Sequence, residues 1–274
     1  MNMRKMGNKW VLLLAMVTIV AMMMVGCASG KTADKKEEPV EKEPAPAPVE
    51  LTIGAAASLT GALNEIIEEY KVEAENVTVT PVYEGSGVIQ KQIEEGAPMD
   101  LFISAAKSNM DTLADEDLIL ADTREDLLTN SLVLIGSAEK ADSLTLDTLA
   151  EASNIALGEI DTVPAGKYAK QSLESLGLWA DIESKIVYQK DVKAVLQAVE
   201  TGNADAGFVY KSDATSMTSA KEIAEVPADS HDPIVYPAAL VKATKEKQAT
   251  EDFLAYLKED DAKTIFEKYG FSVK

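Results

Sequence analysis

Residues 51–71, LTIGAAASLTGALNEIIEEYK, decide the fold. The run Leu51–Ala55 is short and apolar, which predicts a buried strand. Small residues then lead into Leu59–Lys71, where the apolar side chains recur at the spacing of one helical face: Ala62, Leu63, Ile66, Ile67 and Tyr70. A strand that passes through small residues directly into an amphipathic helix is the first half of an α/β unit.

The same alternation continues to the end of the chain. Further strands are expected at Val77–Tyr83, Leu101–Ser104, Ser131–Ile135, Asn154–Leu157, Lys185–Tyr188, Ala206–Tyr210 and Ile234–Val241. Further helices are expected at Val88–Glu95, Lys107–Leu113, Leu146–Ala152, Ala165–Leu176, Val192–Thr201, Thr250–Lys258 and Asp261–Lys268. This pattern predicts an α/β fold of mostly parallel sheets flanked by helices. Ligands of such sheets bind at the carboxyl ends of strands, in the loops that lead into helices.

The chain begins differently. Met1–Lys9 carries three basic residues and no acid, and the run Trp10–Val25 that follows is apolar or neutral. These are the parts of a secretory signal, so residues 1–26 are predicted to be a signal peptide. The apolar run is shorter than the roughly 20 residues of a membrane-spanning helix; an uncleaved membrane anchor is the alternative.

Cys27 is the single cysteine of the chain, so it cannot form an internal disulfide. The segment Met24–Cys27 resembles the bacterial lipobox, in which the cysteine is lipidated and becomes the new N-terminus, although Met24 replaces the usual leucine. Residues 27–50 then mix Lys, Glu, Pro and Ala without apolar periodicity, which predicts a disordered tether. The expected location is therefore extracytoplasmic, on the outer face of the cell membrane through a lipid anchor; a chance cysteine in a signal peptide is the alternative.

The formal net charge is −20, and loss of residues 1–26 with their three basic side chains brings it to about −23. Such acidity argues against nucleic acid and anionic lipid as partners. The 224 residues from Leu51 onward suffice for one large domain or two modest ones.

Four strand-to-helix loops have unusual compositions: AAASLT at 55–60 with Ser58, GSG at 85–87 with Ser86, VPAG at 163–166 with Ala165, and KDV at 190–192 with Val192. Helix N-termini carry free N–H groups and partial positive charge, so they bind anions without a basic side chain. Each loop alone is weak evidence, because a serine there is often a plain helix cap and GSG is often a turn. Together, four converging N-termini and two hydroxyls would surround a small tetrahedral dianion.

Six stretches jointly resemble the periplasmic molybdate-binding proteins of molybdate ABC importers: 55–60, 96–105 (GAPMDLFISA), 161–170 (DTVPAGKYAK), 191–196, 205–210 and 269–274. The resemblance runs from Leu51 to Lys274. It implies a two-lobed, type II periplasmic-binding-protein fold that closes on its ligand about a hinge. The expected lobes are residues 51–130 plus 236–274, and residues 131–235, with chain crossings near Ser131 and Tyr236.

The resemblance also implies which groups bind the oxyanion: the hydroxyls of Ser58, Ser86 and Tyr210 and the backbone N–H groups of Ala165 and Val192. They would hold the metal centre of molybdate through its oxygens, with no cofactor. Ser86 is flanked by glycines where relatives often have a run of serines. Neutral donors would leave the O–H of hydrogen phosphate without a partner, at a cost of about 1–3 kcal/mol. Molybdate, tungstate and sulfate carry no such proton.

The expected function is therefore non-enzymatic: a monomeric solute-binding lipoprotein that captures molybdate, and also tungstate, and delivers it to the membrane permease of an ABC importer. A binding protein for another solute, such as sulfate, an amino acid or a metal ion, is the alternative. An amino-acid binder should have an arginine in one of the four loops, and Arg4 and Arg124 lie elsewhere.

A secreted serine-type hydrolase is the more distant alternative. Ser104–Lys107 and Ser137–Lys140 fit the S-x-x-K pattern, but no S-D-N, K-T-G or G-x-S-x-G accompanies them. His231, the single histidine, lies in a polar turn, which argues against a triad. Four carboxylates are interpreted as caps and turn formers: Asp100, Asp191, Asp205 and Asp213.

Overall fold

The computed structural model describes residues 47–274, and residues 45–274 form one compact unit. The predicted signal peptide 1–26, Cys27 and nearly all of the predicted tether lie outside the described residues. Within 47–274 no helix has both the length and the apolar character needed to cross a membrane.

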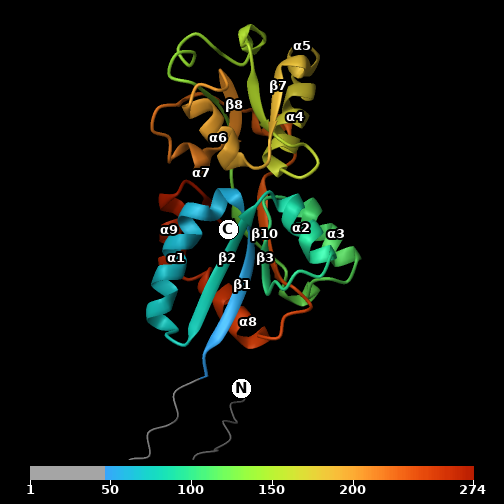
Figure 1. The fold of residues 1–274 in the computed structure, drawn as a ribbon, viewed down its shortest axis with the longest axis vertical. Coiled ribbons are helices and arrows are strands. Elements are labelled where there is room, and N and C mark those ends of the chain that lie inside the picture. The colour runs from blue at the N-terminus through green and yellow to red at the C-terminus, as the bar shows by residue number, and fades with distance from the viewer. Residues whose placement is uncertain (1–46) are drawn as a thin grey trace, which may run out of the picture. The chain divides into compact units, whose positions relative to one another are not determined.

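The first sheet has the strand order β11-β4-β10-β3-β1-β2 (Figure 1). Its strands are β1 (Val49–Ala56), β2 (Val77–Glu84), β3 (Leu101–Ile103), β4 (Glu125–Thr129), β10 (Val235–Leu240) and β11 (Ser272–Val273). β1 pairs in parallel with β2 and β3, whereas β10 runs antiparallel to β3 and β4, and β11 runs antiparallel to β4.

Helices cover both faces of this sheet. α1 (Thr60–Glu73) and α9 (Asp260–Lys268) pack together on one side, and α2 (Ser86–Glu94) and α3 (Lys107–Asp115) pack together on the other (Figure 1). α8 (Lys247–Tyr256) contacts β1 and β10. Ile66 and Phe253 belong to the larger apolar core, and Ile89 and Phe102 to a smaller core under α2 and α3. The sheet is therefore buried on both faces.

The second sheet has the order β7-β6-β8-β5-β9. Its strands are β5 (Leu132–Gly136), β6 (Ile155–Gly158), β7 (Ile186–Gln189), β8 (Ala206–Tyr210) and β9 (Lys221–Glu225). β6 is parallel to β7 and β8, while β5 is antiparallel to β8 and β9. Its helices are α4 (Pro164–Ser175), α5 (Trp179–Ile182), α6 (Val192–Glu200) and α7 (Lys211–Ala214). The chain passes from the first sheet to the second at Asn130–Ser131 and returns between Glu225 and Val235.

Both sheets are mixed, whereas the sequence predicted mostly parallel sheets. The antiparallel strands β4 and β9 were missed, because their sequences, EDLLT and KEIAE, are charged and partly exposed and show no buried apolar run. The predicted helix Leu146–Ala152 was wrong: only a single 3₁₀ turn, η3 (Leu149–Glu151), forms there. Thr145 and Thr148 exchange backbone-to-side-chain hydrogen bonds of 2.9 and 3.1 Å, and such bonds compete with a helix.

Candidate functional site

All five predicted ligand residues line one small cavity. The lining consists of Ala56, Ala57, Ser58, Glu84, Gly85, Ser86, Ala105, Val163, Pro164, Ala165, Val192 and Tyr210. These residues lie at the ends of strands or in the segments just after them: β1, β2 and β3 in the first sheet and β6, β7 and β8 in the second. The cavity volume is about 10 Å³, which is about the space that one water needs. The cavity as it stands therefore has no room for a sugar or a peptide.

Ser58 lies in a 3₁₀ turn, η1 (Ala57–Leu59), which joins the buried end of β1 to α1. Its side chain is buried, and its Oγ lies 2.9 Å from the hydroxyl of Tyr236 on β10. The turn forms because the alanines that end β1 are small enough to bury beside the second sheet, where η1 contacts α6. Ser58 is thus held at the meeting of the two sheets.

Ser86 is the first residue of α2, and its side chain is also buried. Its Oγ accepts a hydrogen bond from the backbone N–H of Ala105 at 3.0 Å. A serine hydroxyl has one hydrogen to donate, and this contact leaves that hydrogen available. The oxygen is oriented by the protein while its proton can be given to a ligand.

The two glycines beside Ser86 allow the sheets to approach closely. A Cβ at Gly85 would lie 2.8 Å from the carbonyl oxygen of Thr162, and a Cβ at Gly87 would lie 2.7 Å from the Cα of Thr162. The N–H of Gly87 donates to that same carbonyl at 2.9 Å. The glycines on both sides of Ser86 are therefore explained by close backbone contact with Thr162, which follows β6 of the second sheet.

Two helix N-termini of the second sheet supply backbone donors. α4 begins at Pro164 after Val163, with no side-chain cap, so the N–H of Ala165 has no partner within its own helix. α6 begins at Val192 after Asp191, whose carboxylate accepts from the N–H of Ala194 at 2.8 Å. This cap satisfies the third residue of α6 and leaves the N–H of Val192, at the first position, without an intrahelical partner.

Tyr210 ends β8 and brings the last predicted group into the cavity. Its side chain is 1% exposed, and its hydroxyl has no hydrogen-bond partner within the described residues. Tyr236 packs edge-on against its ring, with the centroids 5.9 Å apart, but the two hydroxyls are not hydrogen-bonded. Burial raises the pKa of Tyr210 well above its usual value, so the hydroxyl keeps its proton. An unsatisfied buried hydroxyl costs about 1–3 kcal/mol, which an acceptor on a ligand would offset.

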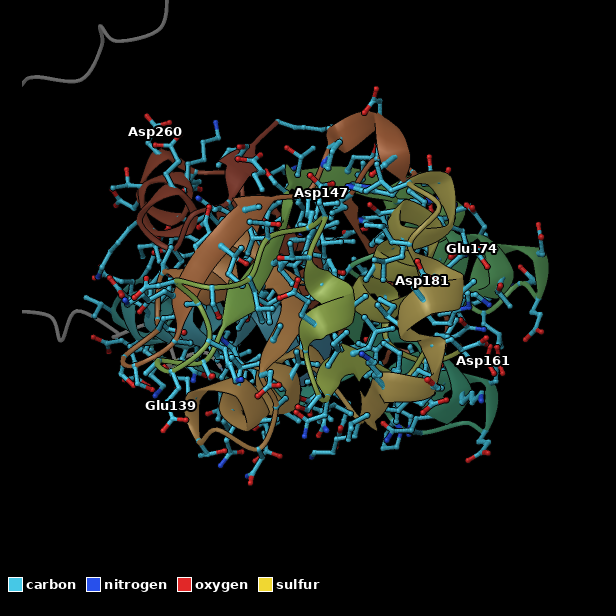
Figure 2. All side chains as sticks on the ribbon, turned by 90° about the horizontal axis from the view of Figure 1, so that it is seen from above. Glu139, Asp147, Asp161, Glu174, Asp181 and Asp260 are labelled. Carbon is cyan, nitrogen blue, oxygen red and sulfur yellow. The ribbon has the colours of Figure 1, made fainter. Side chains whose placement is uncertain are left out.

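The groups of the cavity that can donate a hydrogen bond to a ligand carry no charge. No lysine or arginine stands among the described residues that line the cavity, and Glu84 adds a carboxylate to it. Many other acidic side chains lie on the outer surface, and Figure 2 labels six exposed ones, Glu139, Asp147, Asp161, Glu174, Asp181 and Asp260. Binding of an anion here would rest on N–H and O–H dipoles rather than on opposite charge.

The residues of the hydrolase alternative do not form a catalytic group. Ser104 Oγ donates to the carbonyl of Ala106 at 2.9 Å, while Lys107 pairs with Asp126 at 2.7 Å, so serine and lysine serve separate structural contacts. His231 Nδ1 contacts the carbonyl of Asp232 at 2.7 Å in a surface turn.

Of the four carboxylates predicted to be caps or turn formers, Asp191 caps α6. Asp100 and Asp205 instead make tertiary contacts, because they accept from the N–H groups of Thr52 and Ser153, which are 48 and 52 residues away in the chain. Asp213 differs, because it is fully buried in α7, where its Oδ1 forms an ion pair with Lys193 Nζ at 2.8 Å. Burial raises the pKa of Asp213 even though Lys193 lowers it.

Sequence reasoning named Tyr236 and Asn130 only as places near chain crossings and did not connect them with the site. Asn130 Nδ2 lies 3.3 Å from the hydroxyl of Tyr236, which in turn contacts Ser58. Glu84, the last residue of β2, was also missed. The one available signal was position: each of the three lies at the end or start of a strand that faces the other sheet.

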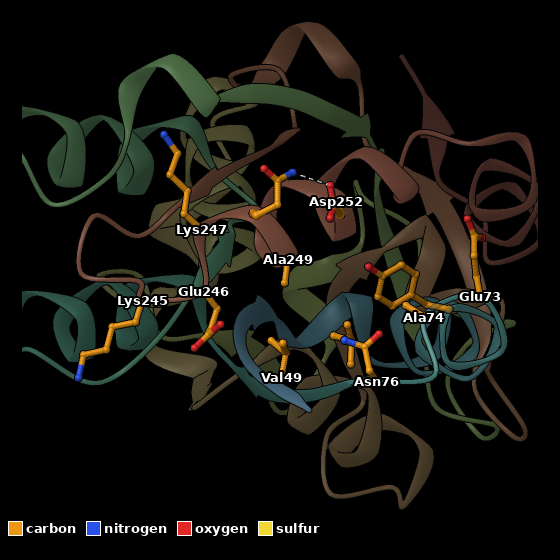
Figure 3. A pocket seen from close by; sticks show the side chains of 12 residues that line it. Val49, Glu73, Ala74, Asn76, Lys245, Glu246, Lys247, Ala249 and Asp252 are labelled. Carbon is orange, nitrogen blue, oxygen red and sulfur yellow. Dashed lines mark hydrogen bonds between the residues drawn. The ribbon is translucent and has the colours of Figure 1, made fainter. Parts of the chain in front are cut away.

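A larger cleft of about 460 Å³ lies elsewhere, between the start of β1, the end of α1 and the start of α8 (Figure 3). Val49, Asn76, Lys247 and Asp252 are among its lining residues, and Gln248 Nε2 donates to Asp252 at 2.9 Å. The cleft contains none of the four loops, and among residues 47–274 no buried polar atom without a partner lines it. The small cavity between the sheets therefore carries the functional argument.

The fold and this cavity define a solute-binding protein, and comparison with known proteins agrees. The family model for bacterial extracellular solute-binding proteins matches residues 51–272, and the chain belongs to that family. This membership confirms the predictions of an extracellular, non-enzymatic solute-binding protein of the ABC-transporter class.

Individual relatives are similar along nearly the whole folded part. YvgL of Bacillus subtilis, named as an ABC transporter substrate-binding lipoprotein, is 40% identical over 270 residues, covering 98% of this chain and all of that one. The molybdate-binding protein ModA of Haemophilus influenzae is 37% identical over 235 residues, covering 83% and 92%. A substrate-binding domain from Clostridium difficile, assigned to a molybdenum ABC transporter, is 44% identical, covers 82% and 98%, and has a TM-score of 0.64. The resemblance and the α/β fold class predicted from the sequence are confirmed.

Proposed function

We propose that this protein captures molybdate, and equally tungstate, between two lobes and delivers it to the permease of an ABC importer. The observation that carries the proposal is the Tyr210 hydroxyl, which is buried, protonated and without a partner among the described residues. It lies in a cavity lined by other neutral donors and by the Glu84 carboxylate. Ser58, Ser86, Ala165 and Val192 supply those donors. Charge-assisted hydrogen bonds to a dianion are about twice as strong as neutral ones, so five such donors suffice without a cation.

The choice of ion rests on donor chemistry and on the names of relatives. The cavity of about 10 Å³ is smaller than a tetrahedral oxyanion, so the donors of the two lobes would stand further apart around a bound ion. In the described residues no cluster of three or more His, Cys, Asp or Glu side chains could hold a bare metal ion, so the metal centre would be held through its oxygens. The name of the 37%-identical relative, a molybdate-binding protein, favours molybdate over sulfate.

Closure between lobes follows from where the donors stand. We assign residues 51–130 plus 236–274 to one lobe and residues 131–235 to the other, with the crossings near Ser131 and Tyr236 as hinge. Ser58 and Ser86 belong to the first lobe, and the other three donors to the second. A ligand that touches both lobes binds the closed state more tightly and so shifts the population toward it.

The lipid anchor at Cys27 is the second part of the proposal. A relative named as a lipoprotein matches 98% of this chain, so the match reaches into the N-terminal segment. Cys27→Ser should move the monomeric protein from the membrane fraction to the soluble extracytoplasmic fraction. Retention of the variant on the membrane would contradict lipidation at Cys27 and favour an uncleaved anchor.

A thermal-unfolding screen with molybdate, tungstate, sulfate and phosphate tests the site. Molybdate and tungstate should raise the unfolding temperature most, and Ser86→Ala should remove most of that rise. Ser143→Ala is the matched control, since Ser143 is exposed and donates to the carbonyl of Lys140. A larger rise with sulfate than with molybdate would assign the site to sulfate, and an unchanged rise in Ser86→Ala would exclude Ser86.

A further inference from the structure

A chain of hydrogen bonds runs behind the ligand cavity. Asn130 Nδ2 donates to Ser212 Oγ at 2.9 Å and to the hydroxyl of Tyr236 at 3.3 Å, and Tyr236 lies 2.9 Å from Ser58 Oγ. Tyr236 is 0% exposed, and Ser58 and Ser212 are also buried. The chain of hydrogen bonds therefore connects α7, the crossing at Asn130, β10 and the cavity.

The contacts of Asn130 restrict the directions of the bonds in this chain. Asn130 Oδ1 accepts from the N–H of Ser131 at 2.9 Å, which fixes the amide so that its nitrogen faces Ser212 and Tyr236. Both hydrogens of that nitrogen are then used. Since an amide nitrogen cannot accept, the Tyr236 hydrogen cannot point toward Asn130. Ser58 Oγ, 2.9 Å away, is the other hydrogen-bond partner of Tyr236 among the described residues and can accept that hydrogen.

This order determines what Ser58 can offer a ligand. When its oxygen accepts from Tyr236, its single hydrogen is left to point into the cavity that it lines. Burial also raises the pKa of Tyr236 well above its usual value, which keeps the donated proton in place. A ligand oxygen that carries its own hydrogen would meet another hydrogen at Ser58.

We propose that Tyr236 and Asn130 are positioning residues that fix Ser58 as a donor, and that this order selects oxyanions without a proton over oxyanions that carry one. The inference rests on the proposed oxyanion function and adds two residues to it that do not touch the ligand. Tyr236 and Asn130 also lie at the two chain crossings, so the relay is assembled where the two sheets meet.

Tyr236→Phe tests the relay with molybdate and with phosphate at pH 7, where phosphate is largely protonated. The variant lets Ser58 Oγ accept a ligand hydrogen. Molybdate affinity should therefore fall about tenfold while phosphate affinity stays the same or rises, so that the molybdate-to-phosphate ratio narrows about tenfold or more. Asn130→Ala should also reduce the ratio of molybdate affinity to phosphate affinity. Tyr269→Phe is the matched control, because its hydroxyl bonds Glu65 at 3.0 Å outside the cavity lining, and it should leave the ratio unchanged.

A double variant separates relay from packing. In the Ser58→Ala background, Tyr236→Phe should have little further effect on molybdate, since its action passes through Ser58. Equal losses for molybdate and phosphate, or additive losses in the double variant, would overturn the relay. Absence of molybdate binding by the unmodified protein would instead overturn the proposed function itself.

Discussion

Replacing Tyr210 by phenylalanine should weaken ligand binding without weakening the fold. The change removes one hydroxyl that is buried and has no partner in the described structure. Loss of an unsatisfied buried group is not destabilising, because its desolvation cost of about 1–3 kcal/mol disappears with it. The free energy of unfolding of the unliganded protein should therefore stay constant or rise by up to about 3 kcal/mol. Each kcal/mol corresponds to about 2–4 °C in unfolding temperature for a protein of this size.

The effect on the ligand has the opposite sign. A hydrogen bond to a charged group contributes about 1.5–3 kcal/mol, so the dissociation constant for molybdate should increase about 10- to 150-fold. At a molybdate concentration about 1,000 times the original dissociation constant, ligand stabilises the unmodified protein by about 4 kcal/mol. A tenfold weaker variant would gain about 2.7 kcal/mol at the same concentration.

Thermal unfolding with and without molybdate measures both effects on the same samples, and titration calorimetry measures the dissociation constant directly. Tyr83→Phe serves as control, since Tyr83 donates to Asn64 at 2.8 Å outside the cavity lining. If the free energy of unfolding of ligand-free Tyr210→Phe fell by more than about 1 kcal/mol, the hydroxyl would have a hydrogen-bond partner in the unliganded protein. Unchanged molybdate affinity would remove Tyr210 from the site.

Three further changes probe closure and buried charge. Gly87→Ala should reduce molybdate affinity at least tenfold in calorimetry while leaving the unliganded unfolding temperature nearly unchanged, because its Cβ would lie 2.7 Å from the Cα of Thr162 when the sheets meet; unchanged affinity would contradict that contact. Burial raises the pKa of Asp213, so the contribution of its protonated form to stability is lost as the pH rises through the raised pKa. In urea titrations at about pH 4 and about pH 8, the stability of Asp213→Asn relative to the unmodified protein should therefore be higher at pH 8. Hydrogen bonding from the N–H of Thr218 lowers the pKa of Glu200, so Glu200→Gln should be less stable at neutral pH and this deficit should shrink as the pH falls. If the stability of both variants relative to the unmodified protein changed in the same direction with pH, the environments assigned to the two carboxylates would be contradicted.

Local patterns in the sequence were sufficient for the elements that lead into the site. β1 and α1 were predictable because the apolar spacing in residues 51–71 changes from a continuous run to a helical period at the small residues before Ser58. The convergence of the four loops was predictable because parallel strands place their carboxyl ends at one edge of a sheet. Strands β4 and β9 were not predictable, since charged, partly exposed strands show no clear apolar period.

The contacts behind the site depend on partners far away in the chain. Tyr236 is 178 residues from Ser58, and its strand β10 shows only an apolar run in the sequence. Gly85 and Gly87 looked like an ordinary turn, because the backbone of Thr162 that requires them belongs to the other sheet. Tertiary contacts of this kind leave no mark in local composition.

Titration calorimetry of the unmodified protein with molybdate and with sulfate, in one buffer, tests the central claim most directly. One molybdate ion per chain should bind, at least about 100-fold more tightly than sulfate, a difference of about 2.7 kcal/mol. Sulfate binding as tight as molybdate binding, or no heat from molybdate, would contradict the account.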